Sequence, residues 1–99
     1  MNLDELRQLC HSETLIVTAH CMERITKRGI ELSEVIQAIM KGEVIEDYPD
    51  DYPYPSTLIL GNGLHVVAGI GDGRLWLITA YRPDVEQWEN DLKTRRAIK

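Results

Sequence analysis

The chain has 99 residues, of which 43% are hydrophobic and 27% charged, and this balance is typical of a single globular domain spanning residues 1–99. No apolar run approaches the ~20 residues that a membrane helix needs, and no secretory leader begins the sequence, so we expect a cytoplasmic protein. The net charge of −5 at pH 7 argues against a general nucleic-acid coat but allows a local basic site.

The N-terminal part of the sequence predicts helices around one short strand. Apolar residues recur at helical spacing in three segments, and a run of β-branched residues lies between the first two. Thr18 is a suitable N-cap for the second helix, and Gly29 and Gly42 are suitable stops for the second and third. In chain order we expect a helix over 3–11, a strand over 14–18, and helices over 18–30 and 32–41.

The second half has the pattern of an antiparallel sheet. An acidic loop over 49–55 carries three prolines, which rule out a helix or a central strand there. Glycine-rich turns at 61–63 and 71–73 separate the later strands. A final helix begins at Pro83, with Val85, Trp88 and Leu92 at helical spacing. The strands of this sheet are expected over 43–48, 57–60, 64–70 and 74–81.

These elements predict an α+β fold, in which N-terminal helices pack on a bent, mainly antiparallel sheet of about four strands and a C-terminal helix follows. With a three-residue loop at 71–73, His65 pairs with Thr79. The polar face then carries His65, Val67, Leu77, Thr79 and Tyr81. The face packed on the helices carries Leu64, Val66, Ala68, Ile70, Trp76, Ile78 and Ala80. A two-residue turn would shift this register.

The helix over 18–30 carries the most reactive set of side chains in the chain. His20, Arg24 and Arg28 are spaced at i, i+4 and i+8 and therefore line one face. The opposite side is expected to be buried and carries Ala19, Cys21, Met22 and Ile25. An imidazole and two guanidiniums on one face can bind a phosphate and move a proton. The same residues can equally form a surface lattice of ion pairs with neighbouring acids.

Further candidates lie in the sheet, the acidic loop and the tail. His65, Thr79 and Tyr81 join the helix face if their strand face meets it, and they are otherwise ordinary strand residues. Aromatic residues can stack on unpaired bases or simply pack, and basic residues can contact RNA or be solvated. These remaining candidates are Tyr48, Tyr54, Arg95 and Arg96. Neither Cys10 nor Cys21 has the spacing of a metal ligand, so we expect no metal and no cofactor.

Several motifs together resemble the signature of a large, uncharacterised bacterial family of domains of unknown function. The first is His20-x3-Arg24-x3-Arg28-Gly-Ile, and the resemblance covers roughly residues 14–96. The other motifs are Gly42 to Pro49, Tyr54-Pro55-Ser56, Leu64-His65-Val-Val, Ile78 to Asp84, Trp88, and Arg95-Arg96. The family is remotely similar to RelE- and BrnT-like toxins, and this similarity implies a small α+β fold and metal-free RNA cleavage by transesterification.

Two functions follow from these observations. On the toxin reading, His20 moves protons, Arg24 and Arg28 stabilise charge, His65 supplies a second proton-transfer group, and Tyr81 and Thr79 orient or donate. The partners implied are RNA and a cognate antitoxin protein. The alternative is a non-catalytic binding or regulatory module that docks a basic protein segment through the acidic Tyr/Pro loop. A homodimer formed through a sheet edge is a further expectation.

Overall fold

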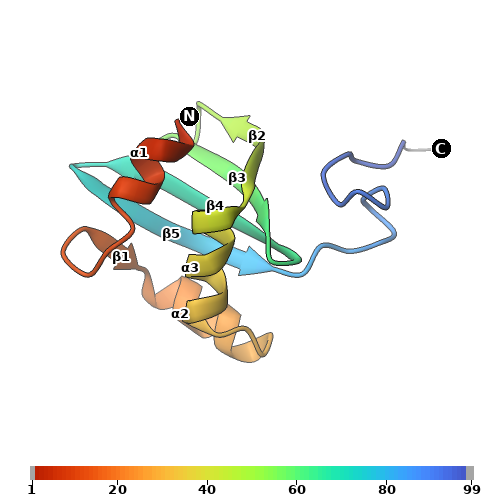
Figure 1. Cartoon of the computed structure of the whole chain (residues 1–99), viewed down its shortest axis with the longest axis horizontal. Coiled ribbons are helices and arrows are strands. Elements are labelled where there is room, and N and C mark those ends of the chain that lie inside the picture. The colour runs from red at the N-terminus through yellow and green to blue at the C-terminus, as the bar shows by residue number, and fades with distance from the viewer. Residues whose placement is uncertain (1, 98–99) are drawn as a thin grey trace.

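The computed structural model describes residues 2–97 and has three helices and one five-stranded mixed sheet, an α+β fold (Figure 1). Strand order is β1-β5-β4-β3-β2, and only β1 runs parallel to its neighbour, β5. The strand expected over 14–18 therefore joins the sheet as its fifth member. The elements are α1 (Leu3–Gln8), β1 (Leu15–Val17), α2 (Ala19–Lys27), α3 (Leu32–Lys41), β2 (Glu43–Tyr48), β3 (Ser56–Gly61), β4 (Leu64–Gly71) and β5 (Arg74–Tyr81).

Local capping groups set the ends of α2, the helix that carries the candidate site. The Thr18 hydroxyl accepts the backbone N–H of Cys21 at 3.0 Å, which satisfies one of the donors left open in a first helical turn. At the other end Gly29 adopts φ +67°, a conformation that glycine reaches without steric cost. Thr18 and Gly29 flank the helix as the sequence predicted, although α2 ends at Lys27 rather than residue 30. Of the four residues expected on its buried side, Cys21 and Ile25 are buried, whereas Ala19 and Met22 are exposed because the core lies against only part of that side.

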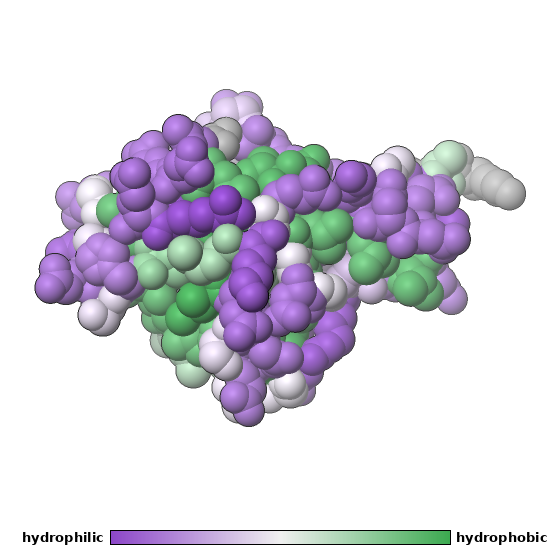
Figure 2. Space-filling model, in the orientation of Figure 1, coloured by the Kyte–Doolittle hydropathy of each residue, from purple (hydrophilic) through white to green (hydrophobic). Residues whose placement is uncertain are grey.

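The core lies between the helices and one face of the sheet. In Figure 1, α1 and α3 cross in front of the sheet. Figure 2 shows hydrophilic residues over α1 and an apolar area between α1 and α2. The centre of the core is formed by buried residues of the three helices and of β3, β4 and β5. They include Leu6, Cys21, Ile25, Val35, Ala38, Ile39, Ile59, Val66, Ala68, Leu75, Leu77 and Ala80.

The predicted register of the last hairpin is wrong, because its turn has two residues rather than three. Asp72 and Gly73 adopt φ +55° and +70°, the geometry of a tight primed turn, so Ile70 pairs with Leu75. The register then shifts between Val67 and Ala68, where β5 carries one residue more than β4. His65 consequently pairs with Tyr81 and not with Thr79.

This register also changes which side chains face the helices. Leu77, expected on the polar face, is fully buried in the core beside Leu75. Trp76 and Ile78, expected in the core, lie instead on the opposite face of the sheet. The two-residue turn therefore places an indole ring where it can line a surface site.

The prediction of a C-terminal helix is also wrong. Residues 83–97 form turns and one isolated bridge between Trp88 and Arg95. The backbone N–H of Trp88 bonds to the Asp84 carbonyl, but the chain then reverses. The Asp91 carboxylate accepts the backbone N–H groups of residues 93 and 94, and this side-chain bonding competes with helical hydrogen bonds. The reversal is stabilised by packing of Trp88, which is 3% exposed.

No helix within residues 2–97 has the length and apolar character needed to cross a bilayer.

Candidate functional site

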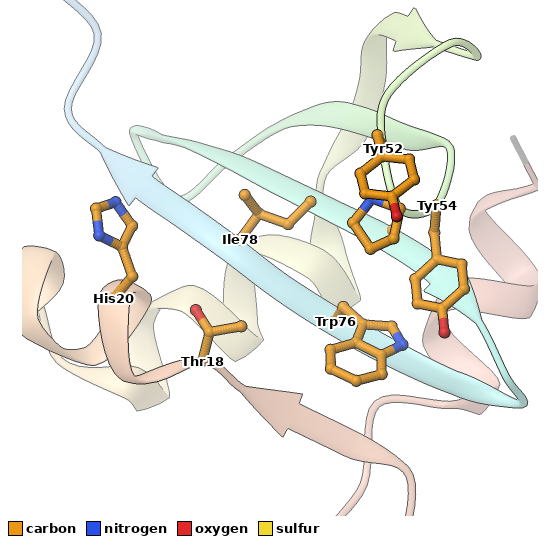
Figure 3. Close-up of a pocket in the computed structure, with 8 residues that line it drawn as sticks. Thr18, His20, Tyr52, Tyr54, Trp76 and Ile78 are labelled. Carbon is orange, nitrogen blue, oxygen red and sulfur yellow. The ribbon is translucent and has the colours of Figure 1, made fainter.

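A hollow of about 360 Å³ lies on the sheet face opposite α1 and α3. Figure 3 shows His20 at one end, the rings of Tyr52, Tyr54 and Trp76 at the other, and Thr18 and Ile78 between them. The walls come from the start of α2, from β4 and β5, and from the Tyr/Pro loop. The lining residues are Thr18, His20, Tyr52, Pro53, Tyr54, Gly69, Trp76 and Ile78.

The N-cap of α2 fixes the position of His20. Besides capping α2, the Thr18 hydroxyl lies 3.4 Å from the Leu77 carbonyl and so ties the start of the helix to β5. His20 follows in the first turn, and its exposed imidazole has no hydrogen-bond or ion-pair partner among residues 2–97. The imidazole is therefore available to a ligand.

The aromatic end is built on close packing between the loop and the last hairpin. The Trp76 indole N–H donates to the Gly71 carbonyl at 2.9 Å, which fixes the ring plane. Tyr54 packs on Trp76 with ring centroids 5.6 Å apart, and its ring occupies the space that a side chain at position 71 would need. Tyr52 is 95% exposed at the rim.

Two arginines, Arg24 and Arg28, follow His20 along α2 and its C-cap. Arg24, one turn further on, is exposed, and its guanidinium has no hydrogen bond or ion pair within the described chain. Arg28 donates through Nη1 to the Thr79 hydroxyl at 3.2 Å and to the Ala80 carbonyl at 2.8 Å, and Arg82 donates to the Arg28 carbonyl. Among residues 2–97 neither Arg24 nor Arg28 pairs with an acid, so the alternative of a surface lattice of ion pairs is not formed at these two residues.

His65 lies apart from His20, beneath the C-terminal segment. Its ring is fully buried, with Nε2 2.5 Å from the Leu92 carbonyl and Nδ1 3.4 Å from the Tyr81 hydroxyl. The Trp88 ring meets it edge-on at 4.5 Å. Burial lowers the pKa of His65, so the neutral ring is favoured, with Nε2 donating to Leu92. Both ring nitrogens have protein neighbours, and the hollow does not include this residue.

The other residues predicted to contact RNA instead bond to groups of the protein itself. Arg95 forms two hydrogen bonds to the Glu46 carboxylate, at 2.9 and 3.0 Å, and lies over the Trp88 ring. The Tyr48 hydroxyl donates to Glu46 at 2.7 Å, and burial together with this carboxylate raises the pKa of Tyr48 to about 12. Arg96 bonds to the Val85 carbonyl and to Glu89.

The structure therefore brings together only part of the predicted set. His20 and Tyr54 line the hollow, and Arg24 lies one helical turn from His20. The hollow also includes residues that the sequence analysis did not select, above all Trp76 and Tyr52. The Asp-Gly pair at 72–73 could have predicted the place of Trp76, because Asp-Gly favours a two-residue turn and that turn puts Trp76 on this face of the sheet. Within residues 2–97, no three His, Cys, Asp or Glu side chains gather closely enough to hold a metal ion.

Comparison with known proteins identifies one family. Its model matches residues 17–82, which contain α2, α3 and strands β2 to β5, and ends ahead of the C-terminal segment. No curated protein and no solved structure matches the chain, so the relation to RelE- and BrnT-like toxins stays a prediction. Because the match covers more than half of the chain, the protein belongs to this family, described as Domain of unknown function (DUF4258).

Proposed function

We propose that the protein is a toxin-type endoribonuclease that cleaves RNA by metal-independent transesterification at the exposed face of α2. The observation that carries the proposal is an exposed imidazole, His20, at one end of the hollow, followed one helical turn on by the guanidinium of Arg24, which has no hydrogen bond or ion pair among residues 2–97. Imidazole is the side chain best able to take and return a proton near neutral pH.

The proposed reaction needs one proton carrier and charge stabilisation. The neutral ring of His20 takes the proton of a ribose 2′-hydroxyl as the 2′-oxygen forms a bond to the adjacent phosphorus. The bond from phosphorus to the 5′-oxygen then breaks, and the imidazolium returns the proton to that oxygen. The products are a 2′,3′-cyclic phosphate and a 5′-hydroxyl. His65 has no part in this scheme because its ring is buried and contacts Leu92.

Arg24 supports this reaction through its position and its charge. A guanidinium binds two phosphate oxygens at once and stabilises the negative charge that develops on them. Arg28 extends the positive field, although its Nη1 group also bonds to β5. An antitoxin protein that covers this face would neutralise the activity.

The first test is induced expression in a bacterial host, with growth and RNA integrity measured for the parent, His20→Ala and Arg24→Ala. We expect each substitution to lower the rate of cleavage by the purified protein about 10²–10⁴-fold. The matched control is His11→Ala, because His11 is an exposed imidazole outside the hollow. Cleavage by the parent should persist in EDTA and leave cyclic phosphate ends. Equal cleavage by His20→Ala and the parent would refute the proposal.

The acidic loop favours a second candidate function, a non-catalytic module that docks a basic segment of a partner protein. Tyr52 is 95% exposed and is preceded by two exposed carboxylates, Asp50 and Asp51. Charge complementarity of this kind guides association with a basic partner. Replacing Asp50 by Asn and Tyr52 by Ala should then release a partner that co-purifies with the parent. Retention of that partner by the double variant would exclude the loop as its binding site.

A further inference from the structure

We propose that the hollow is a subsite for one unpaired purine base, which stacks at the aromatic end while its phosphate lies toward His20 and Arg24. The inference rests on the proposed RNA-directed function and specifies its substrate: a single-stranded RNA segment with one base turned out of the stack. It adds Trp76, Tyr52 and Ile78 to the residues that contact RNA.

The shape of the hollow matches the order of groups in a nucleotide. Figure 3 shows the rings of Trp76, Tyr54 and Tyr52 at one end, Ile78 in the middle and His20 at the other end. A base, a ribose and a phosphate can be laid along these groups in the same order. A volume of about 360 Å³ is at the lower end of the ~300–1,000 Å³ range for small-molecule sites, so one nucleotide fits and a duplex does not.

The surroundings of the hollow set the direction in which a nucleotide would bind. The loop that forms one wall also carries two exposed acids beside the hollow, Asp50 and Asp51, and Asp51 accepts a hydrogen bond from Ser56. The opposite wall is the start of α2, where His20 lines the hollow, and Arg24 follows one turn further along the helix, beyond the lining residues. A phosphate is repelled by the first wall and attracted by the second, so the base is directed toward the aromatic rings.

The chemistry of the lining predicts weak sequence preference and a preference for purines. The Trp76 N–H is already bonded to the Gly71 carbonyl, and the Thr18 hydroxyl is occupied by Cys21 and Leu77. Few groups therefore remain to read the edge of a base, and binding depends on stacking. A purine has the larger ring surface and should bind more tightly. Paired bases are stacked inside their helix and cannot enter.

The test follows the indole N–H resonances of the protein while nucleotides are added. The chain has only two tryptophans, Trp76 in the hollow and Trp88 beneath the C-terminal segment, so the second is an internal control. We expect 3′-AMP and a short single-stranded oligoadenylate to shift the Trp76 resonance and leave that of Trp88 in place. Uridine nucleotides should bind more weakly, and the same oligonucleotide in a duplex should not bind.

Substitutions divide the site into its two ends. Trp76→Leu should weaken binding of 3′-AMP roughly 5- to 150-fold, the range measured for loss of one stacking partner. Tyr52→Ala should also weaken binding, and it leaves the fold intact because this side chain is exposed. Met40→Ala, on α3 and outside the hollow, is the matched control. Arg24→Gln should remove the advantage of 3′-AMP over adenosine without changing the affinity for adenosine.

The outcomes separate this inference from the proposed nuclease activity. RNA cleavage that requires His20, without any nucleotide response at Trp76, overturns the base subsite and leaves the nuclease standing. A shift at Trp76 without cleavage supports the subsite and refutes the nuclease. A shift caused by a proline- or aromatic-containing peptide but by no nucleotide would overturn the subsite in favour of peptide binding.

Discussion

The substitution Gly71→Ala provides a direct test of how the aromatic end is assembled. A Cβ atom at this position would lie 2.1, 2.2 and 2.5 Å from three ring carbons of Tyr54. Ordinary carbon–carbon contacts are ~3.5–4.0 Å, so the ring would have to withdraw by about 1.5 Å. The contact between Tyr54 and Trp76, worth ~0.5–1.5 kcal/mol, would be lost or distorted. Including the strain of overpacking, we expect the free energy of unfolding to fall by about 1–3 kcal/mol.

Urea denaturation measures that loss, and the Trp76 indole resonance and 3′-AMP titration measure the change in the hollow. Gly73→Ala is the matched control in the same turn. A Cβ atom at position 73 would have no neighbour within 4 Å, although the φ angle of +70° is unfavourable for alanine. That variant should lose about 1–2 kcal/mol through backbone strain while the Trp76 resonance and nucleotide affinity stay unchanged. If Gly71→Ala also left both signals unchanged, the packing of Tyr54 on the hairpin would be refuted.

Three further predictions concern stability. Thr18→Ala should lower the free energy of unfolding by about 0.5–2 kcal/mol by removing the cap of α2, whereas Thr18→Ser should retain most of it in thermal denaturation. Arg7→Met should cost about 1.5–3 kcal/mol in urea denaturation, because the guanidinium donates to the Ile39 and Gly42 carbonyls at the end of α3; a cost below 0.5 kcal/mol would contradict those bonds. Burial lowers the pKa of His65 in the folded protein below its unfolded value of ~6.5. In acid the unfolded chain therefore binds more protons than the folded one, and the free energy of unfolding decreases as the pH falls from ~6.5 through the pKa of folded His65. His65→Gln should therefore show a smaller loss of stability between pH 7 and pH 5 than the parent, and parallel profiles would exclude this role.

The N-terminal helices and most strands were predictable because their signals are local. Thr18 and Gly29 delimit α2 through bonds and backbone angles within a few residues. The end of the chain was not predictable in this way. The spacing of Val85, Trp88 and Leu92 is helical, but Trp88 packs against His65 of β4. Arg95, which lies over the Trp88 ring, is in turn bonded to Glu46 of β2. Tertiary packing of this kind overrides the helical pattern.

The candidate site was predicted in part for the same reason. The face of His20 and Arg24 follows from helical spacing alone, so the sequence analysis found it. The aromatic wall depends on the length of one turn, since a one-residue change in register moves Trp76 from one side of the sheet to the other. The sequence pattern put His65 and Tyr81 on one face of the sheet but paired His65 with Thr79, whereas the extra residue in β5 brings Tyr81 opposite His65.

The parallel pairing of β1 with β5 has a consequence for folding during synthesis. Leu15 pairs with Leu75 and Val17 with Leu77, so the first strand cannot dock until nearly the whole sheet has left the ribosome. The helices α2 and α3 can form earlier from local signals, but the start of α2 is tied to the Leu77 carbonyl through Thr18. The last step that orders β1 also fixes His20, so a nascent chain would lack the assembled hollow until β5 has been synthesised.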